Sequence, residues 1–152
     1  MKKMFKLAIV LGTVLLIACS PKGERESDLL KLVDGFNQRV TSGDFRSIYI
    51  NASPVLRSVV TEAEFSANLK EVNEYLGEKK SPDLSRLVTT AAPDNSSVSV
   101  LVYETQFEKG KGTESFFIHV SDGEAKLYRY EIESDVLPRS TPYSHQEPDE
   151  KS

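Results

Sequence analysis

The sequence predicts an α+β domain in which N-terminal helices pack on a four-stranded antiparallel sheet. Between residues 27 and 76, apolar residues recur every three or four positions, as they do on one face of a helix. Between residues 84 and 132, apolar and polar residues alternate, and short clusters of turn-forming residues interrupt the alternation. Because short links favour pairing of neighbouring strands, we expect the four strands to form a meander.

The first helix is expected over residues 27–42. Its apolar residues fall on one stripe of a helical surface, and Gly43 follows the last turn, where a glycine commonly ends a helix. The stripe consists of Leu29, Val33, Phe36 and Val40. A short second helical segment is expected to begin at Asp44 and to include Tyr49.

Capping residues mark two further helices. Ser53 followed by Pro54 predicts a short helix over residues 55–60, since serine caps a helix and proline suits its first position. Thr61 and Glu64 have the spacing of a capping box, which opens a longer helix that ends at Gly77. The apolar stripe of this helix consists of Phe65, Leu69, Val72 and Leu76. The two long helices therefore need a common apolar surface to cover.

The alternating region supplies that surface. Strands are expected over residues 84–92, 97–107, 113–120 and 125–132, separated by turns that include the Asp122-Gly123 pair of a tight hairpin. The second strand should place two sets of residues on opposite faces. One set is Val98, Val100 and Val102, and the other is Leu101, Tyr103 and Phe107.

The N-terminus has the pattern of a secretory signal. Three early lysines precede an apolar run over residues 7–18, which is shorter than the roughly 20 residues that span a bilayer. The run ends in Leu16-Ile17-Ala18-Cys19, which resembles the lipobox of bacterial lipoproteins. This resemblance implies that residues 1–18 are a signal peptide and that Cys19, the only cysteine, is the lipid attachment site. The alternative for a lone cysteine is a buried structural thiol.

The lipoprotein resemblance also implies a location. Such proteins carry a diacylglyceryl group and usually an additional acyl chain such as palmitate, and two or more chains hold a protein durably on a membrane. Ser20 implies transfer to the periplasmic face of the outer membrane. We expect residues 19–26 to form a lipidated tether, residues 27–133 the folded domain, and residues 134–152 a disordered tail.

The charge of the chain restricts its partners. The formal net charge of the 152 residues is −4, and removal of the three lysines of the signal peptide leaves −7. An acidic protein is a poor ligand for nucleic acid, and electrostatic attachment to anionic lipid would need clustered lysine and arginine. We therefore expect a membrane partner through lipid alone and no nucleic-acid partner.

Several short motifs resemble a known family of the bacterial envelope, domain of unknown function 4019, over roughly residues 28–133. The motifs are Ser42-Gly43-Asp44-Phe45, Tyr49, Ala52-Ser53-Pro54, Leu56-Arg57, Val60-Thr61, Glu64-Phe65 and Leu76-Gly77. Two positions depart from the family pattern. Tyr49 stands where tryptophan is common, and the last hairpin reads Gly123-Glu124-Ala125-Lys126, with no aromatic residue directly after its glycine. The resemblance implies an NTF2-like cone, as in the nuclear transport factor 2 superfamily, but carries no established activity.

Enzymes with such cones place an acid or histidine base beside a tyrosine donor. The candidate pocket residues here are Tyr49, Tyr103, His119 and Tyr128. We expect no catalysis, since no acid is recognised at an apolar strand position to act as a partner for His119. The sequence also has no zinc-ligand spacing, and His145 has no second ligand type near it, so neither a metal nor a cofactor is expected.

The sequence therefore favours a non-catalytic binding or interaction module of the cell envelope. One form is a module whose cone mouth or exposed edge strand binds a small ligand or peptide. A second form is a structural or assembly accessory that docks on an envelope protein through the acidic side of the helix after Thr61, although such a side can simply be solvated. The acidic residues are Glu62, Glu64, Glu71, Glu74 and Glu78. A small NTF2-like enzyme is the remaining alternative.

Overall fold

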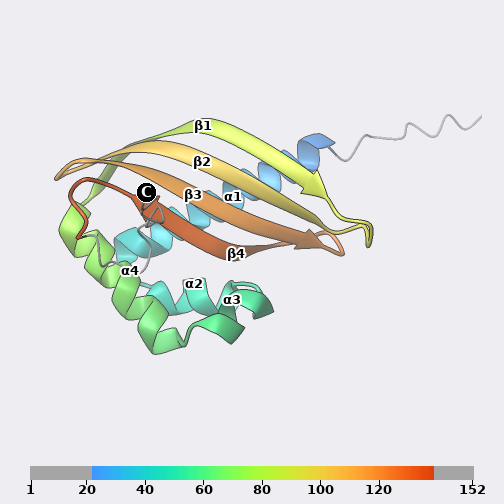
Figure 1. The fold of residues 1–152 in the computed structure, drawn as a ribbon, viewed down its shortest axis with the longest axis horizontal. Helices are drawn as coiled ribbons and strands as arrows, with labels where there is room; N and C mark the ends of the chain where they lie inside the picture. The colour runs from blue at the N-terminus through green and yellow to red at the C-terminus, as the bar shows by residue number, and fades with distance from the viewer. Residues whose placement is uncertain (1–21, 139–152) are drawn as a thin grey trace, which may run out of the picture.

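The computed structural model describes residues 22–138, which form four helices followed by four strands, as Figure 1 shows. The helices are α1 (Lys22–Ser42), α2 (Phe45–Asn51), α3 (Pro54–Val59) and α4 (Glu62–Leu76). The strands are β1 (Lys79–Ala91), β2 (Ser97–Phe107), β3 (Lys111–Ser121) and β4 (Glu124–Glu133). The α+β class is therefore confirmed.

The sheet is an antiparallel meander in the order β1-β2-β3-β4, as expected from the short links. It curves, and α2, α3 and α4 lie together on one side of it (Figure 1). This arrangement is compatible with an NTF2-like cone.

The core lies between the helices and the inner face of the sheet. The expected stripes of α1 and α4 are buried there, apart from the half-buried Val40, and the face of β2 that carries Leu101 and Tyr103 packs against them. Phe116 of β3 lies at the centre and is fully buried. Its ring centroid lies 5.1 Å from that of Phe36 on α1 and 5.1 Å from that of Tyr130 on β4. Apolar burial of this kind is the main stabilising contribution to a domain without disulfides.

The predicted helix caps are present. Ser53 Oγ accepts from Leu56 N, and Thr61 and Glu64 form both hydrogen bonds of the capping box. The hydrogen bonds from Thr61 lower the pKa of the Glu64 carboxyl. Gly77 ends α4 with a φ of 71°, a backbone conformation that glycine adopts without strain. Local sequence thus fixes where these helices begin and end.

The N-terminal boundary differs from the expectation of a tether over residues 19–26. α1 begins at Lys22, so residues 22–26 are helical, which fits the good helix formers Glu24, Arg25 and Glu26. Residues 1–21 lie outside the described part of the chain, so the signal peptide and the lipid at Cys19 stay predictions. Within residues 22–138, no helix combines the length and the apolar character needed to cross a membrane.

The C-terminal boundary also moves, because the fold includes residues 134–138, which were expected to belong to a disordered tail. Leu137 is buried in the core and Val136 packs beside it. Ser134 Oγ donates to Lys111 O over 2.6 Å, which ties this segment to the start of β3. Burial of Leu137 and partial burial of Val136 stabilise the segment against the core, together with this hydrogen bond. Residues 139–152 lie outside the described part of the chain.

The first strand is longer than expected, since it begins at Lys79 rather than at Leu84. Pro82 lies within it, and β1 accommodates this proline because it is an edge strand, where one side of the backbone needs no partner strand. The register shifts between Lys79 and Ser81 and again between Leu84 and Arg86. The extension matters because it brings Lys79 over the inner face of the sheet.

Replacing Phe116 tests the centre of the core. Phe116→Ala should lower the free energy of unfolding by about 3–5 kcal/mol, because it removes a fully buried ring and leaves a cavity. Chemical denaturation of the full-length protein in detergent measures the loss. Val59→Ala is the control, since Val59 is 79% exposed, and it should change stability by less than about 0.5 kcal/mol. Equal effects of the two substitutions would contradict this description of the core.

Candidate functional site

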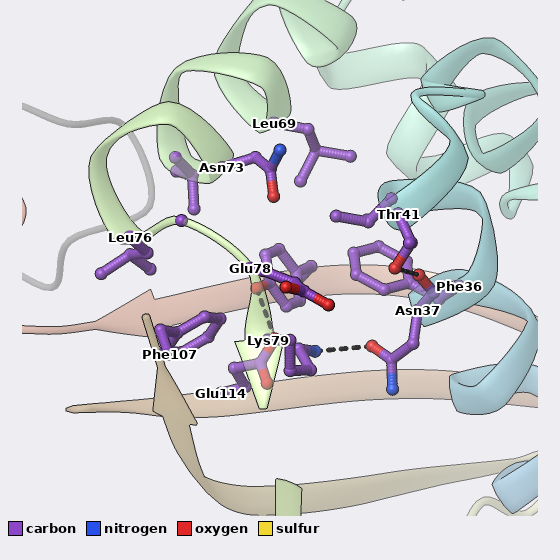
Figure 2. Close-up of a pocket in the computed structure, with 14 residues that line it drawn as sticks. Phe36, Asn37, Thr41, Leu69, Asn73, Leu76, Glu78, Lys79, Phe107 and Glu114 are labelled. Atoms are coloured by element: carbon purple, nitrogen blue, oxygen red, sulfur yellow. Dashed lines mark hydrogen bonds and ion pairs between the residues drawn. The ribbon is translucent and has the colours of Figure 1, made fainter. Parts of the chain in front are cut away.

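A pocket of about 200 Å³ opens between the C-terminal halves of α1 and α4 and the inner face of the sheet (Figure 2). Its walls are largely apolar. They consist of Phe36 and Val40 of α1, Leu69, Val72 and Leu76 of α4, and Phe107 of β2. The polar groups lie on the floor and at the mouth, and the most deeply buried of them is the carboxylate of Glu114.

Glu114 projects from β3 into the core and is only 1% exposed. One carboxylate oxygen accepts from Lys79 Nζ and from the Tyr130 hydroxyl, both over 2.8 Å. The other oxygen accepts from Thr105 Oγ1 over 2.7 Å. The carboxylate therefore has three donors, which is how a buried charge is tolerated in a protein core.

Lys79 is the counter-ion of Glu114, and its side chain is 15% exposed. Its ammonium also donates to Asn37 Oδ1 over 2.6 Å, an interaction shown in Figure 2, and lies 5.8 Å from the ring centroid of Phe107. Through this group α1, β1 and β3 are joined at one point. An ammonium held by an acid, an amide and an aromatic ring has a fixed position at the floor of the pocket.

The turn from α4 into β1 sets the position of Lys79. A Cβ on Gly77 would lie 2.7 Å from Glu108 Oε2, so only glycine fits between the helix end and the β2–β3 turn. Two backbone hydrogen bonds join these segments, from Glu108 N to Glu78 O over 2.9 Å and from Lys109 N to Leu76 O over 3.0 Å. Backbone hydrogen bonds between the α4–β1 turn and the β2–β3 turn thus fix this side of the pocket mouth.

Sequence reasoning missed Glu114 and Lys79. The statement that no acid stands at an apolar strand position is wrong, because Glu114 alternates with the buried Phe116 and Ile118 and shares their face of β3. That alternation was the signal that could have identified it. Lys79 gave no such signal, since it lies outside the expected first strand.

The four predicted pocket residues do not come together, and none of them lines this pocket. Tyr103 is on the inner face, in contact with the ring of Phe116, and burial raises the pKa of its hydroxyl, with the negative charges of Asp34 and Glu114 adding to the effect. His119 alternates with buried residues of β3 and so faces the opposite side of the sheet. Tyr128 is exposed on β4.

Tyr49 has a structural role instead. Its hydroxyl donates to Val60 O over 3.0 Å, and its ring lies against Phe65 with a centroid distance of 5.8 Å. The side chain therefore joins α2 to the entry of α4. Tyr49 lines neither the pocket over Glu114 nor either of two other hollows beside α1.

Two other hollows lie on the described surface. One, between α1, α2 and the β3–β4 hairpin, is lined partly by charged side chains such as Asp28 and Arg39. The other lies between the first turns of α1 and the sheet, beside Leu29 and Ser99. Neither contains a buried charged side chain, so the pocket over Glu114 is the stronger candidate. Within residues 22–138, no group of three or more acidic, histidine or cysteine side chains could hold a metal ion.

Residues 30–130 match the family described as "Protein of unknown function (DUF4019)". The chain belongs to this family. The DUF4019 region includes every residue of the Glu114 network and most of α1, so the pocket lies within the part that defines the family. Comparison with curated proteins finds no match to the sequence.

The ion pair in the DUF4019 pocket can be tested by a double-mutant cycle. Glu114→Gln and Lys79→Met should each lower the free energy of unfolding by about 3–5 kcal/mol, because each leaves one buried charge without its partner. The double variant should lose clearly less than the two losses combined, since both charges are then gone. Denaturation of the full-length protein measures all three variants.

The control for this cycle is Glu133→Gln, a change at an exposed glutamate on the neighbouring strand. It should alter stability by less than about 0.5 kcal/mol. Additive losses in the double variant would show that Lys79 and Glu114 do not stabilise each other.

Proposed function

We propose that this protein is a lipid-anchored module of the bacterial envelope that binds a small ligand in the pocket over Glu114 without catalysing a reaction. The observation that carries the proposal is a buried ion pair on the floor of a largely apolar, open pocket. A buried ion pair is often no more stabilising than apolar residues of similar size. Its position at a cavity is therefore better explained by a ligand than by stability.

The hydrogen bonds of Glu114 favour binding over catalysis. A general base needs a free acceptor within reach of the proton that it removes. Both carboxylate oxygens of Glu114 already accept from Lys79, Tyr130 and Thr105. This arrangement supports a carboxylate that positions Lys79, rather than one that reacts.

The proposed anchor and the pocket lie at opposite ends of α1. Only Ser20 and Pro21 separate Cys19 from the first residue of α1, and this link spans about 10 Å at most when fully extended. Asn37, which lines the pocket, lies fifteen residues after Lys22, the first residue of α1, so the two are separated by about 22 Å along the helix axis. Lipid at Cys19 would thus hold one end of the domain at the outer membrane and leave the pocket open to the periplasm.

The second candidate, an assembly accessory that docks through the acidic side of α4, has weaker support. Glu62 pairs with Arg46 at 3.3 Å and Glu74 with Lys70 at 3.9 Å. Glu64 is used in the capping box, and Glu78 lies beyond the end of α4 and pairs with Lys80 at 2.6 Å. Most of the acidic charge already has a partner within the domain, which leaves little to attract a basic protein.

The anchor is tested by changing the lipid attachment site. Cys19→Ser should move the protein out of the membrane fraction or leave an unprocessed precursor, because the acyl chains can no longer be attached. Fractionation together with mass spectrometry of the N-terminus checks this. Ser27→Ala, a change at an exposed position in the first turns of α1, is the control and should stay in the membrane fraction. An unmodified residue 19 in the membrane fraction of the unaltered protein would contradict the anchor.

Ligand binding is tested by photo-crosslinking in cells. A photoreactive residue in place of Thr41, at the pocket mouth, should form a recurrent small adduct on illumination, whereas one in place of Glu71, on the exposed side of α4, should not. Mass spectrometry of the purified protein identifies the adducts. No adduct at Thr41 together with a recurrent protein adduct at Glu71 would favour the accessory instead.

A further inference from the structure

The volume of the pocket limits the part of a ligand that it can enclose to about the size of one large side chain with its peptide unit. A closed apolar cavity of about 150 Å³ accepts a molecule of the size of benzene. The pocket here has about 200 Å³, is open on one side, and is walled by side chains such as Val40, Leu69 and Phe107. It therefore suits a short apolar body that extends out of the mouth through a polar group.

The charges around the pocket compensate one another. Lys79 is neutralised on the floor by Glu114 at 2.8 Å. At the mouth, Glu78 pairs with Lys80, whose hydrogen bond and positive charge lower the pKa of the Glu78 carboxyl. An anionic ligand would meet cations that already have counter-ions, and a cationic ligand would meet carboxylates that already have theirs. A charged ligand of either sign would therefore lose its hydration without gaining an unpaired opposite charge. An uncharged polar group avoids this penalty.

Unused hydrogen-bonding groups lie on the floor and at two sides of the pocket. Lys79 has three N–H donors, and within the described residues two of them are accepted, by Asn37 and by Glu114. The Asn37 amide nitrogen and the whole Asn73 amide have no hydrogen-bond partner within residues 22–138. Figure 2 shows Asn73 on α4 and Asn37 on α1 on two sides of the pocket. The site thus offers donors from Lys79 and Asn37, and both a donor and an acceptor from Asn73.

We infer that the pocket binds an uncharged carboxamide carried on a small apolar body, such as an apolar residue within a peptide or a single amide of that kind. The carbonyl of the ligand would accept from Lys79 or Asn37, and its N–H would donate to Asn73 Oδ1. The inference rests on the proposed function, because it names the ligand class of the same pocket. Glu114 then acts as a positioning residue that fixes Lys79 and cancels its charge.

Three probes with the same apolar body test the ligand class. They are N-acetyl-leucine amide, which is neutral, N-acetyl-leucine, which is an anion, and leucine amide, which is mainly a cation at pH 6.5. Calorimetry or NMR titration of the full-length protein in detergent gives the affinities. The neutral amide should bind at least about 5-fold more tightly than either charged probe, since a difference of about 1 kcal/mol corresponds to that ratio.

Variants locate the binding. Asn73→Ala should weaken binding of the neutral amide by about 3- to 10-fold, the range expected for one hydrogen bond, and Glu71→Ala on the same helix should leave it unchanged. Thr41→Phe should abolish binding of every probe, because it fills the mouth from an exposed position on α1. Circular dichroism confirms that each variant is folded.

The outcomes separate the two proposals. If a charged probe binds as tightly as the neutral amide and Thr41→Phe abolishes both, the carboxamide inference fails and the ligand-binding function stands. If no probe binds, the carboxamide inference also fails, and crosslinking at Thr41 decides the function separately. If probes bind equally to the unaltered protein and to Thr41→Phe, both proposals fail for this pocket.

Discussion

The ion pair between Lys79 and Glu114 is the interaction on which the rest of the structure depends. Five elements meet at this ion pair. All four strands contribute a residue, namely Lys79 of β1, Thr105 of β2, Glu114 of β3 and Tyr130 of β4. The fifth element is α1, whose Asn37 accepts a hydrogen bond from Lys79. The buried carboxylate is satisfied by three donors, Lys79, Thr105 and Tyr130, so the position of Glu114 depends on three other strands. A slip of one residue in the pairing of β3 would turn Glu114 to the other face of the sheet and leave its partners unsatisfied.

The pair also explains why a pocket is present at this end of the domain. Further towards the N-terminus of α1, the apolar side chains of Leu29 and Val33 are buried, and the hollow beside Leu29 contains no buried charged side chain. Around Lys79, residues of α1 and α4 lie on two sides of the pocket, over polar groups that further apolar packing would leave without hydration. Every buried side-chain nitrogen and oxygen within residues 22–138 has a hydrogen-bond partner. The polar groups on the floor of the pocket therefore need no further contact from the helices above them. Stability and an open site are compatible here because the charges satisfy each other.

The sequence predicted those features that local chemistry decides. The capping box at Thr61, the end of α4 at Gly77 and the alternation of β2 were all correct, since each depends on residues close in sequence. The Glu114 network was missed because its partners come from three other strands, and the pairing register that brings them together is not visible in the pattern of any one strand. The boundary at residue 133 was wrong for a related reason, since burial of Leu137 depends on a tertiary contact that composition does not reveal.

The most direct test of this account is a ¹H–¹⁵N correlation spectrum of the lysine ammonium groups in the full-length protein. Exposed ammonium protons exchange rapidly with water, whereas Lys79 is held by Asn37 and Glu114 and is largely shielded from solvent. The account predicts a slowly exchanging ammonium signal at neutral pH that disappears in Lys79→Met. A spectrum in which the Lys79 signal exchanges as fast as those of exposed lysines would contradict it, because the buried pair would then not exist in solution.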